Sequence, residues 1–400
     1  MARLPVLLTA LVALAACDAQ GDTAVPLAPR PQEAMSPGAF RASLTAFGQT
    51  STADVSGVPQ GYTEVDPLNA AGLWLAGTQG GETRANAIYY GPGGSNYGPC
   101  DDGTGGVFAL SADSTYLADG WPVAAGAPVT ADGRPRAYGD EMLWTSLCSV
   151  PADPSRLQDR PLDGLRVNVA VFRYDDEPSV IYVRYELRNG GAEAITDAYA
   201  GQWSDPDWYE ATENLSGFDR DRALSYVYLS ERYDTRVENR GERRTPLERG
   251  RVTGVAVLQA PTGAPLAGHR ELRKNTPGPT SDVISAASGG TYESYRYALR
   301  GLGNDGSDVV DPSGAVSQFA FTGDPVSGTG WLDGGDGDGP PRGRELRALT
   351  SAGPFALAPG ESAAFTVVWA VASGDGLAGG LDALRQHVDG ARAAPSRWRF

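Results

Sequence analysis

The sequence predicts an all-β fold, an antiparallel β-sandwich with one short helix near the C-terminus. Glycine and proline account for 52 and 29 of the 400 residues, a usage typical of short strands joined by tight turns. Apolar residues alternate with polar ones at the period of a half-buried strand, most clearly between residues 165 and 187. This pattern fits either one large sandwich or two packed sub-domains.

The first seventeen residues have the features of an export signal. Arg3 precedes an apolar run, residues 4–13, which leads into Leu14-Ala15-Ala16-Cys17. A positive charge, a short apolar core and small residues before the cleavage point are typical of a secretory signal. The run is shorter than the roughly 20 residues needed to span a bilayer.

This segment resembles a bacterial lipoprotein signal with its lipobox. The resemblance implies that residues 1–16 are removed and that Cys17 is acylated, so that the N-terminal lipid attaches the protein to a bacterial membrane. Asp18 follows the cysteine, and in some bacteria an aspartate there retains a lipoprotein at the inner membrane. We expect a location in the cell envelope, at the outer membrane or cell surface, with the inner membrane as the alternative.

The remaining cysteines predict a disulfide. The chain has three cysteines, and lipidation of Cys17 leaves Cys100 and Cys148. An even number of cysteines in an exported protein indicates pairing in an oxidising compartment. Two free buried thiols are the alternative.

Residues 17–58 are rich in Pro, Ala, Ser and Gln, and we expect a flexible tether between membrane and domain, with a weakly patterned helix over 40–47. An N-terminal β sub-domain is expected over 59–150, with strands at 72–77 and 85–90 bounded by glycine.

The main β-sandwich domain is expected over 165–395, and a boundary between the sub-domains is expected near residues 151–164. Its predicted strands are 165–174, 180–187, 198–203, 224–229, 353–357 and 365–371. From residue 379 the period changes, because Leu381, Leu384 and Val388 recur at helical spacing. One terminal helix on the sheet is predicted.

The body also resembles a group of secreted all-β bacterial surface proteins that have no assigned chemistry. Many members of that group end in a C-terminal sorting domain, whereas this sequence stops at Phe400; a lipid on Cys17 would supply the anchoring instead. The matching pieces are Trp121-Pro122-Val123, Tyr138-Gly139-Asp140-Glu141-Met142-Leu143-Trp144, Trp203-Ser204-Asp205-Pro206-Asp207, Gly217-Phe218-Asp219, Leu224-Ser225-Tyr226-Val227-Tyr228, Gly323-Asp324-Pro325, Gly330-Trp331 and Ser351-Ala352-Gly353-Pro354-Phe355.

Four aspartates form the best candidate for a metal site. Asp205 and Asp207 follow the predicted strand 198–203, and Asp219 and Asp221 precede the strand 224–229. A hairpin-like return would bring them together, and hard oxygen ligands of this kind suit Ca²⁺. The alternative is that these aspartates form turns by bonding their own backbone.

Aromatic residues beside this acidic segment suggest a glycan contact. Trp203, Trp208 and Tyr209 flank it, and aromatic faces next to carboxylates are one way in which β-sandwiches hold sugars. Against this, aromatic residues in strands mostly belong to the core.

The sequence assigns no catalytic residue and requires no cofactor. His269 and His387 are the two histidines, and neither a zinc-protease motif nor a nucleophile elbow occurs. A formal net charge of −16 disfavours binding to nucleic acid. We therefore expect a lipid-anchored cell-envelope protein of structural or binding type, with an envelope protein or a glycan as its partner. The alternative is a carboxylate-dependent glycan-active or other hydrolytic enzyme, which needs only two suitably spaced carboxylates.

Overall fold

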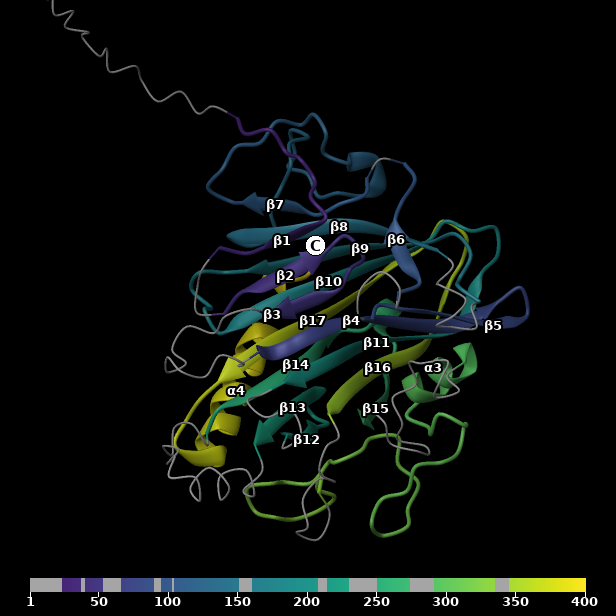
Figure 1. Ribbon diagram of the computed structural model, residues 1–400, viewed down its shortest axis with the longest axis vertical. Helices are drawn as coiled ribbons and strands as arrows, with labels where there is room; N and C mark the ends of the chain where they lie inside the picture. The colour runs from purple at the N-terminus through teal and green to yellow at the C-terminus, as the bar shows by residue number, and fades with distance from the viewer. Residues whose placement is uncertain are drawn as a thin grey trace, which may run out of the picture.

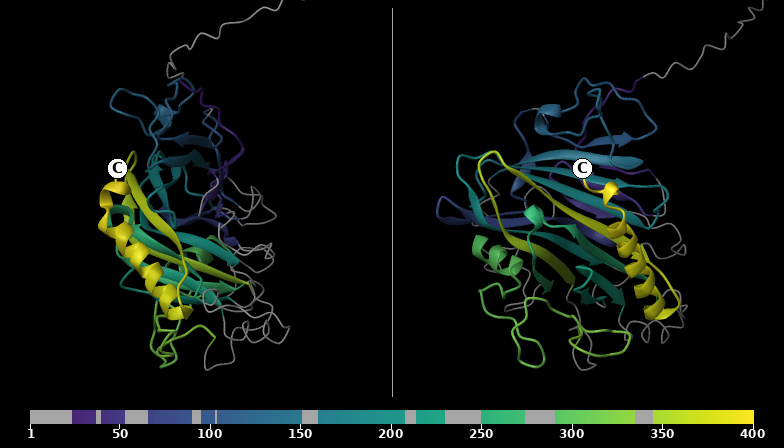
Figure 2. Two further views of the ribbon diagram at one scale, coloured as in Figure 1. Left: turned by 90° about the vertical axis from the view of Figure 1, so that its left-hand side faces the viewer. Right: turned by 180° about the vertical axis from the view of Figure 1, so that it is seen from behind.

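The computed structural model describes residues 24–36, 40–52, 66–89, 95–102, 104–150, 160–207, 214–229, 250–273, 291–334 and 345–400. These residues form two antiparallel sheets packed face to face, with one helix on the outer side of each (Figures 1 and 2). The predicted β-sandwich is confirmed.

One sheet has eight strands in the described part of the chain. Its spatial order is β1 (Gln32–Ala34), β2 (Ala42–Thr45), β3 (Thr50–Thr52), β4 (Asp66–Gln79), β11 (Ile195–Asp207), β16 (Leu346–Leu357) and β15 (Leu266–Arg273), while β5 (Glu82–Ala87) pairs with β4.

The other sheet has nine strands among the described residues. Its order is β12 (Asn214–Asp219), β13 (Leu224–Leu229), β14 (Val252–Gln259), β17 (Ser362–Ala372), β10 (Val180–Asn189), β9 (Leu165–Arg173), β8 (Glu141–Ser149) and β6 (Tyr97–Pro99), while β7 (Phe108–Ser111) pairs with β8.

Two helices cover the outer faces, which are the faces turned away from the opposite sheet. Helix α3 (Tyr292–Leu299) packs on the eight-stranded sheet over β4 and β5, and α4 (Gly376–Ala393) packs on the nine-stranded sheet over β17 and β14. Figure 2 shows α4, in yellow, lying along the face opposite to the viewer of Figure 1. Three apolar clusters result: one between the sheets, one under α4 and one under α3.

The two predicted strands with the clearest alternation, 165–174 and 180–187, correspond to β9 and β10 of the nine-stranded sheet. Leu165, Val167, Val169 and Val171 on β9 share the inter-sheet core with the alternate residues of β10 from Ile181 to Leu187. The helical period also holds, because Leu381, Leu384 and Val388 are among the residues that α4 buries. Alternate side chains of a strand point to opposite faces, so these patterns fixed the inward face correctly.

The predicted tether is wrong for residues 24–36 and 40–52. These residues form β1, β2 and β3 at the edge of the eight-stranded sheet, and β2 replaces the helix expected near Phe40. Met35, Phe40 and Leu44 are buried in the inter-sheet core and hold this polar segment in place. The rest of 17–58, including Cys17, lies outside the described residues.

The expected division near 151–164 does not appear in the strand pairing. Strand β8 pairs with β9 across that segment, and β4 pairs with β11. Strands from the two predicted sub-domains therefore share both sheets, and the described residues form one sandwich.

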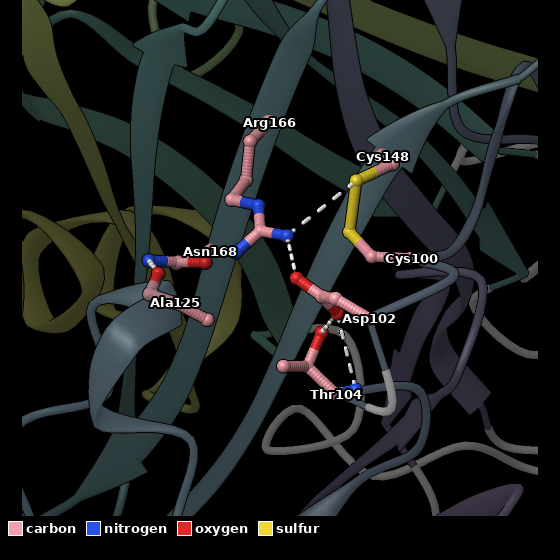
Figure 3. Close-up of a disulfide and its surroundings, with 7 residues drawn as sticks. All are labelled: Cys100, Asp102, Thr104, Ala125, Cys148, Arg166 and Asn168. Carbon is pink, nitrogen blue, oxygen red and sulfur yellow. Dashed lines mark hydrogen bonds and ion pairs between the residues drawn. A yellow bond between two sulfur atoms is a disulfide. The ribbon is translucent and has the colours of Figure 1, made fainter.

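The predicted disulfide is present. Cys100 follows β6 and Cys148 lies near the end of β8, with their Cα atoms 5.0 Å apart (Figure 3). Since β6 pairs with β8 through Gly98 and Cys148, the bond fastens the loop after β6 to the strand beside it.

Replacing both Cys100 and Cys148 with serine is expected to destabilise the protein by about 4 kcal/mol, because the bond closes a long loop in the unfolded chain. The sequence separation of 48 residues sets that magnitude. Urea unfolding of the oxidised protein and of the double variant measures it, and reduced wild-type protein should match the variant. Equal unfolding midpoints would contradict this stabilising role.

Candidate functional site

A buried carboxylate lies near the end of β11. Asp205 is 1% exposed and follows Trp203 by two residues in a stretch where the register with β4 is continuous. Residues two apart on a strand share a face, so Asp205 lies on the outer face, as Trp203 does. A carboxylate in such a place needs a partner, since an isolated buried charge is costly.

Arg347 on β16 supplies that partner. Its Nε lies 3.6 Å from Oδ1 of Asp205, and each side chain is 1% exposed. The Nδ2 of Asn69 donates to Oδ2 of Asp205 at 3.1 Å, and Arg347 also donates to Oε2 of Glu345 at 3.2 Å. We call Asn69, Asp205, Asp207, Glu345 and Arg347 the Asp205 site.

The site shifts the pKa of its central acid. Burial raises the pKa of Asp205 to about 7, against the opposing effect of Arg347, and the nearby charges of Asp207 and Glu345 raise it further, while the hydrogen bond from Asn69 lowers it. A carboxyl group that holds a proton near neutral pH has the property of a general acid. Strongly perturbed acids also occur in structural ion pairs.

Aromatic rings pack beside the Asp205 site. Trp203 stacks on Trp74 with ring centroids 6.2 Å apart, and Tyr89 tilts against Trp203 at 4.7 Å. Tyr295 from α3 meets Trp74 edge-on at 4.7 Å. Trp203 and Trp74 are fully buried, so a sugar would reach the Trp203 ring only if these rings moved apart.

The other two predicted metal ligands lie in a different layer. Asp219 ends β12 and accepts from Arg222 at 3.1 Å and from Arg385 of α4 at 3.2 Å, and Arg222 also binds Asp389 of α4. Asp221 is exposed in the turn that follows. Asp219 therefore fastens the β12–β13 turn to the helix on the nine-stranded sheet.

The structure brings Asp205 and Asp207 together on one strand but does not bring Asp219 and Asp221 to them. Across the described ranges, no three side chains of His, Cys, Asp or Glu form a group that could hold a metal ion. Calcium binding stays a prediction of the sequence. Trp208 and Tyr209 lie outside the described residues, so their predicted glycan contact also stays a prediction.

Sequence reasoning missed a second buried carboxylate pair. The Ser216 hydroxyl donates to Oε2 of Glu271 at 2.9 Å and lies 3.5 Å from Oδ2 of Asp333, which also accepts the Ser216 backbone N–H at 2.8 Å. Both carboxylates are buried, Glu271 at 6% and Asp333 at 8% exposure. These residues come from β12, β15 and a loop, so no local pattern in the sequence links them.

A signal for Arg347 was present. A charged residue interrupts the apolar strand pattern from Leu346 to Leu349, and a charge inside a buried strand is kept only with a partner. His269, one of the two histidines, lies fully buried on β15 with its ring stacked on Phe218 at 4.5 Å. Burial lowers the pKa of His269 to about 3, so its imidazole is neutral.

Asp205→Asn is expected to change how stability depends on pH. The carboxyl ionises near pH 4 in the unfolded chain and near pH 7 in the folded one, so the wild-type protein loses stability as pH rises through this window, by up to about 1.4 kcal/mol per pH unit. The variant lacks this loss. Its free energy of unfolding, measured relative to that of the wild type, should therefore be higher at pH 8 than at pH 5. Urea unfolding at both pH values measures the difference. Asp113→Asn, an exposed control, should follow the wild type; parallel curves for Asp205→Asn would contradict the expectation.

Comparison with known proteins gives no family. No family model matches the chain, and no curated protein matches it in sequence. Among solved structures, the chain is similar to a putative aldose 1-epimerase from Escherichia coli K12, with 9% identity and a TM-score of 0.34 over 87% of this chain and 99% of that one. A similarity this distant carries no argument about what the present chain does.

Proposed function

We propose that this protein is an exported lipoprotein of the bacterial cell envelope, in which acyl chains on Cys17 hold a β-sandwich that acts as a binding or structural module. The observation that carries the proposal is the Cys100–Cys148 disulfide. The chain has three cysteines, so this bond leaves Cys17 with no cysteine of its own chain to pair with. A disulfide also fits an oxidising compartment outside the cytoplasm.

Lipid attachment would supply the membrane affinity. No helix within the described ranges is long and apolar enough to cross a bilayer. Several acyl chains on one cysteine make a stable anchor, at about 0.8 kcal/mol per buried methylene.

Backbone hydrogen bonds near Val25 limit the length of chain between the sandwich and the proposed lipid. The backbone N–H of Val25 donates to the Thr115 carbonyl at 2.8 Å, and the Val25 carbonyl accepts from Leu117. Six residues lie between Cys17 and Ala24, and the seven steps from one Cα atom to the next reach at most about 25 Å. In Figure 1 the chain enters beside β7, whereas β12, β13 and β15 lie at the other end of the molecule. The end with β7 would therefore face the bilayer.

Cys17→Ser is expected to abolish incorporation of radiolabelled palmitate, because the thiol that accepts the lipid is gone. The measurement is labelling of expressing cells followed by immunoprecipitation, with membrane and soluble fractions compared. Cys100→Ser is the matched control and should keep its label. Continued labelling of Cys17→Ser would overturn the lipoprotein proposal.

The Asp205 site favours a second candidate function, a carboxylate-dependent hydrolase acting on glycans. Its support is the pairing of one acid whose pKa burial raises to about 7 with a second carboxylate, Asp207, two residues along the same strand. Glycoside hydrolysis uses a protonated carboxyl group and a second carboxylate, and in this second function Asp205 and Asp207 would take those roles. The full burial of Asp205 and Trp203 weighs against this second function, because a substrate must reach the acid.

If the protein hydrolyses a glycosidic bond, Asp205→Asn should lower kcat about 10²- to 10⁴-fold, because the proton donor is lost. Wild-type activity should fall as pH rises above about 7, where Asp205 ionises. A panel of aryl glycosides and soluble envelope glycans provides the assay. Asp113→Asn should retain full activity, and an equal rate in Asp205→Asn would exclude this acid.

A further inference from the structure

Two arginines face each other on neighbouring strands of the nine-stranded sheet. Arg166 on β9 is the direct register partner of Arg188 on β10, and Cys148 on β8 is the register partner of Arg166 on its other side. Opposed residues of antiparallel strands have Cβ atoms roughly 4.5–5.5 Å apart, and like charges in that arrangement are destabilising. A charge cost of this kind calls for an anion to offset it.

One acidic side chain offsets half of this charge. Asp102 pairs with Nη2 of Arg166, and the same nitrogen lies 3.9 Å from the sulfur of Cys148 (Figure 3). Thr104 holds Asp102 through backbone and hydroxyl hydrogen bonds. Arg188 is exposed, and no ion pair or side-chain hydrogen bond involves it within the described residues. The group of Arg166, Arg188 and Asp102 therefore keeps a net positive charge in a chain whose formal net charge is −16.

The arginines line a pocket of about 320 Å³ together with Cys148, Ser149, Gly164 and Gly190. Its wall requires glycine, because Gly164 has a φ of +66° and a Cβ there would lie 2.3 Å from the backbone nitrogen of Gly191. A second pocket of about 380 Å³ shares Ser149 and Gly164, but it is also lined by Arg84, Asp163 and Glu193, so of the two only the first pocket has arginines without a lining carboxylate. The first volume is at the lower end of the range for small-molecule sites and suits a monosaccharide.

We propose that this arginine pocket binds the oxyanion of a monosaccharide-sized ligand, a carboxylate or a phosphate, between Arg166 and Arg188. Guanidinium groups bind planar carboxylates and phosphates through paired N–H donors. The bound anion would offset the repulsion between the two arginines, and Asp102 would compete with it for Arg166. The proposal concerns the folded body and does not depend on lipid at Cys17.

The test is calorimetric titration of the purified mature chain at low ionic strength with galacturonate, glucose 6-phosphate, inorganic sulfate and, as the uncharged control, galactose. At least one sugar anion should bind and galactose should not. Arg188→Gln should weaken binding about tenfold or more, as expected for loss of a charge-assisted hydrogen bond. Asp102→Asn should strengthen binding, because a competing carboxylate is removed.

Arg184→Gln is the matched control, because Arg184 lies on the same face of β10 and its loss changes the net charge equally. Its contacts are to Gln259 and the Phe400 carbonyl, so it should bind the sugar anion as the wild type does. Thermal unfolding should show that both variants are folded. Equal weakening in the two variants, or no binding of either sugar anion, would overturn the proposal. Binding of sulfate alone would reveal an adventitious ion only and would also overturn it.

Discussion

A buried hydrogen bond links strands of the two sheets across the core between them. The Tyr185 hydroxyl on β10 donates to Oε1 of Gln202 on β11 at 3.0 Å, and Nε2 of Gln202 donates to the Trp203 carbonyl at 2.9 Å. Burial raises the pKa of Tyr185 far above its usual value, so the phenol stays a donor. A satisfied polar contact in a core fixes one arrangement of the layers, since any slip would leave both groups unpaired. Trp203 and Asp205 take their positions from this contact, because they follow Gln202 on the same strand.

Asp205 and Asp219 differ in their surroundings, because the first is buried on the outer face of its sheet and the second is partly exposed. The face that carries Asp205 is closed by α3 and its aromatic residues, and there a charge persists only beside Arg347. Removing one partner of such a pair typically costs about 3–5 kcal/mol. Asp219, by contrast, belongs to a partly exposed network with Arg222 and Arg385, where screening makes each contact worth little. Both aspartates are followed two residues later by a second aspartate. The sequence alone therefore does not tell that one is a buried acid with a raised pKa and that the other forms ion pairs near the surface.

The predictable parts of the fold are the strands and the helix whose apolar residues recur at a regular spacing along the chain. Strands β9, β10 and β17 and helix α4 carry apolar residues at fixed spacing, and the disulfide followed from counting cysteines. The edge strands β1, β2 and β3 escaped prediction, because three or four residues such as Gln32–Ala34 hold no full period. Helix α3 was also missed, although Thr291 and Ser294 form a capping box at its start. Contacts such as Asp205 with Arg347 and Arg166 with Arg188 depend on strand register, which a single sequence does not reveal.

The disulfide connects stability with the proposed arginine pocket. The disulfide holds the segment that carries Asp102 and Thr104 against β8, beside Arg166. The same bond therefore keeps the Asp102 carboxylate next to Arg166, where it neutralises one of the two arginine charges of the pocket. A site with one net positive charge and an open rim would bind a single oxyanion weakly. Under the proposed anchoring, a tether of at most about 25 Å would keep that site at the membrane surface, where effective concentrations reach the millimolar range. Weak affinity for an anionic group is then sufficient if the group repeats along an envelope glycan.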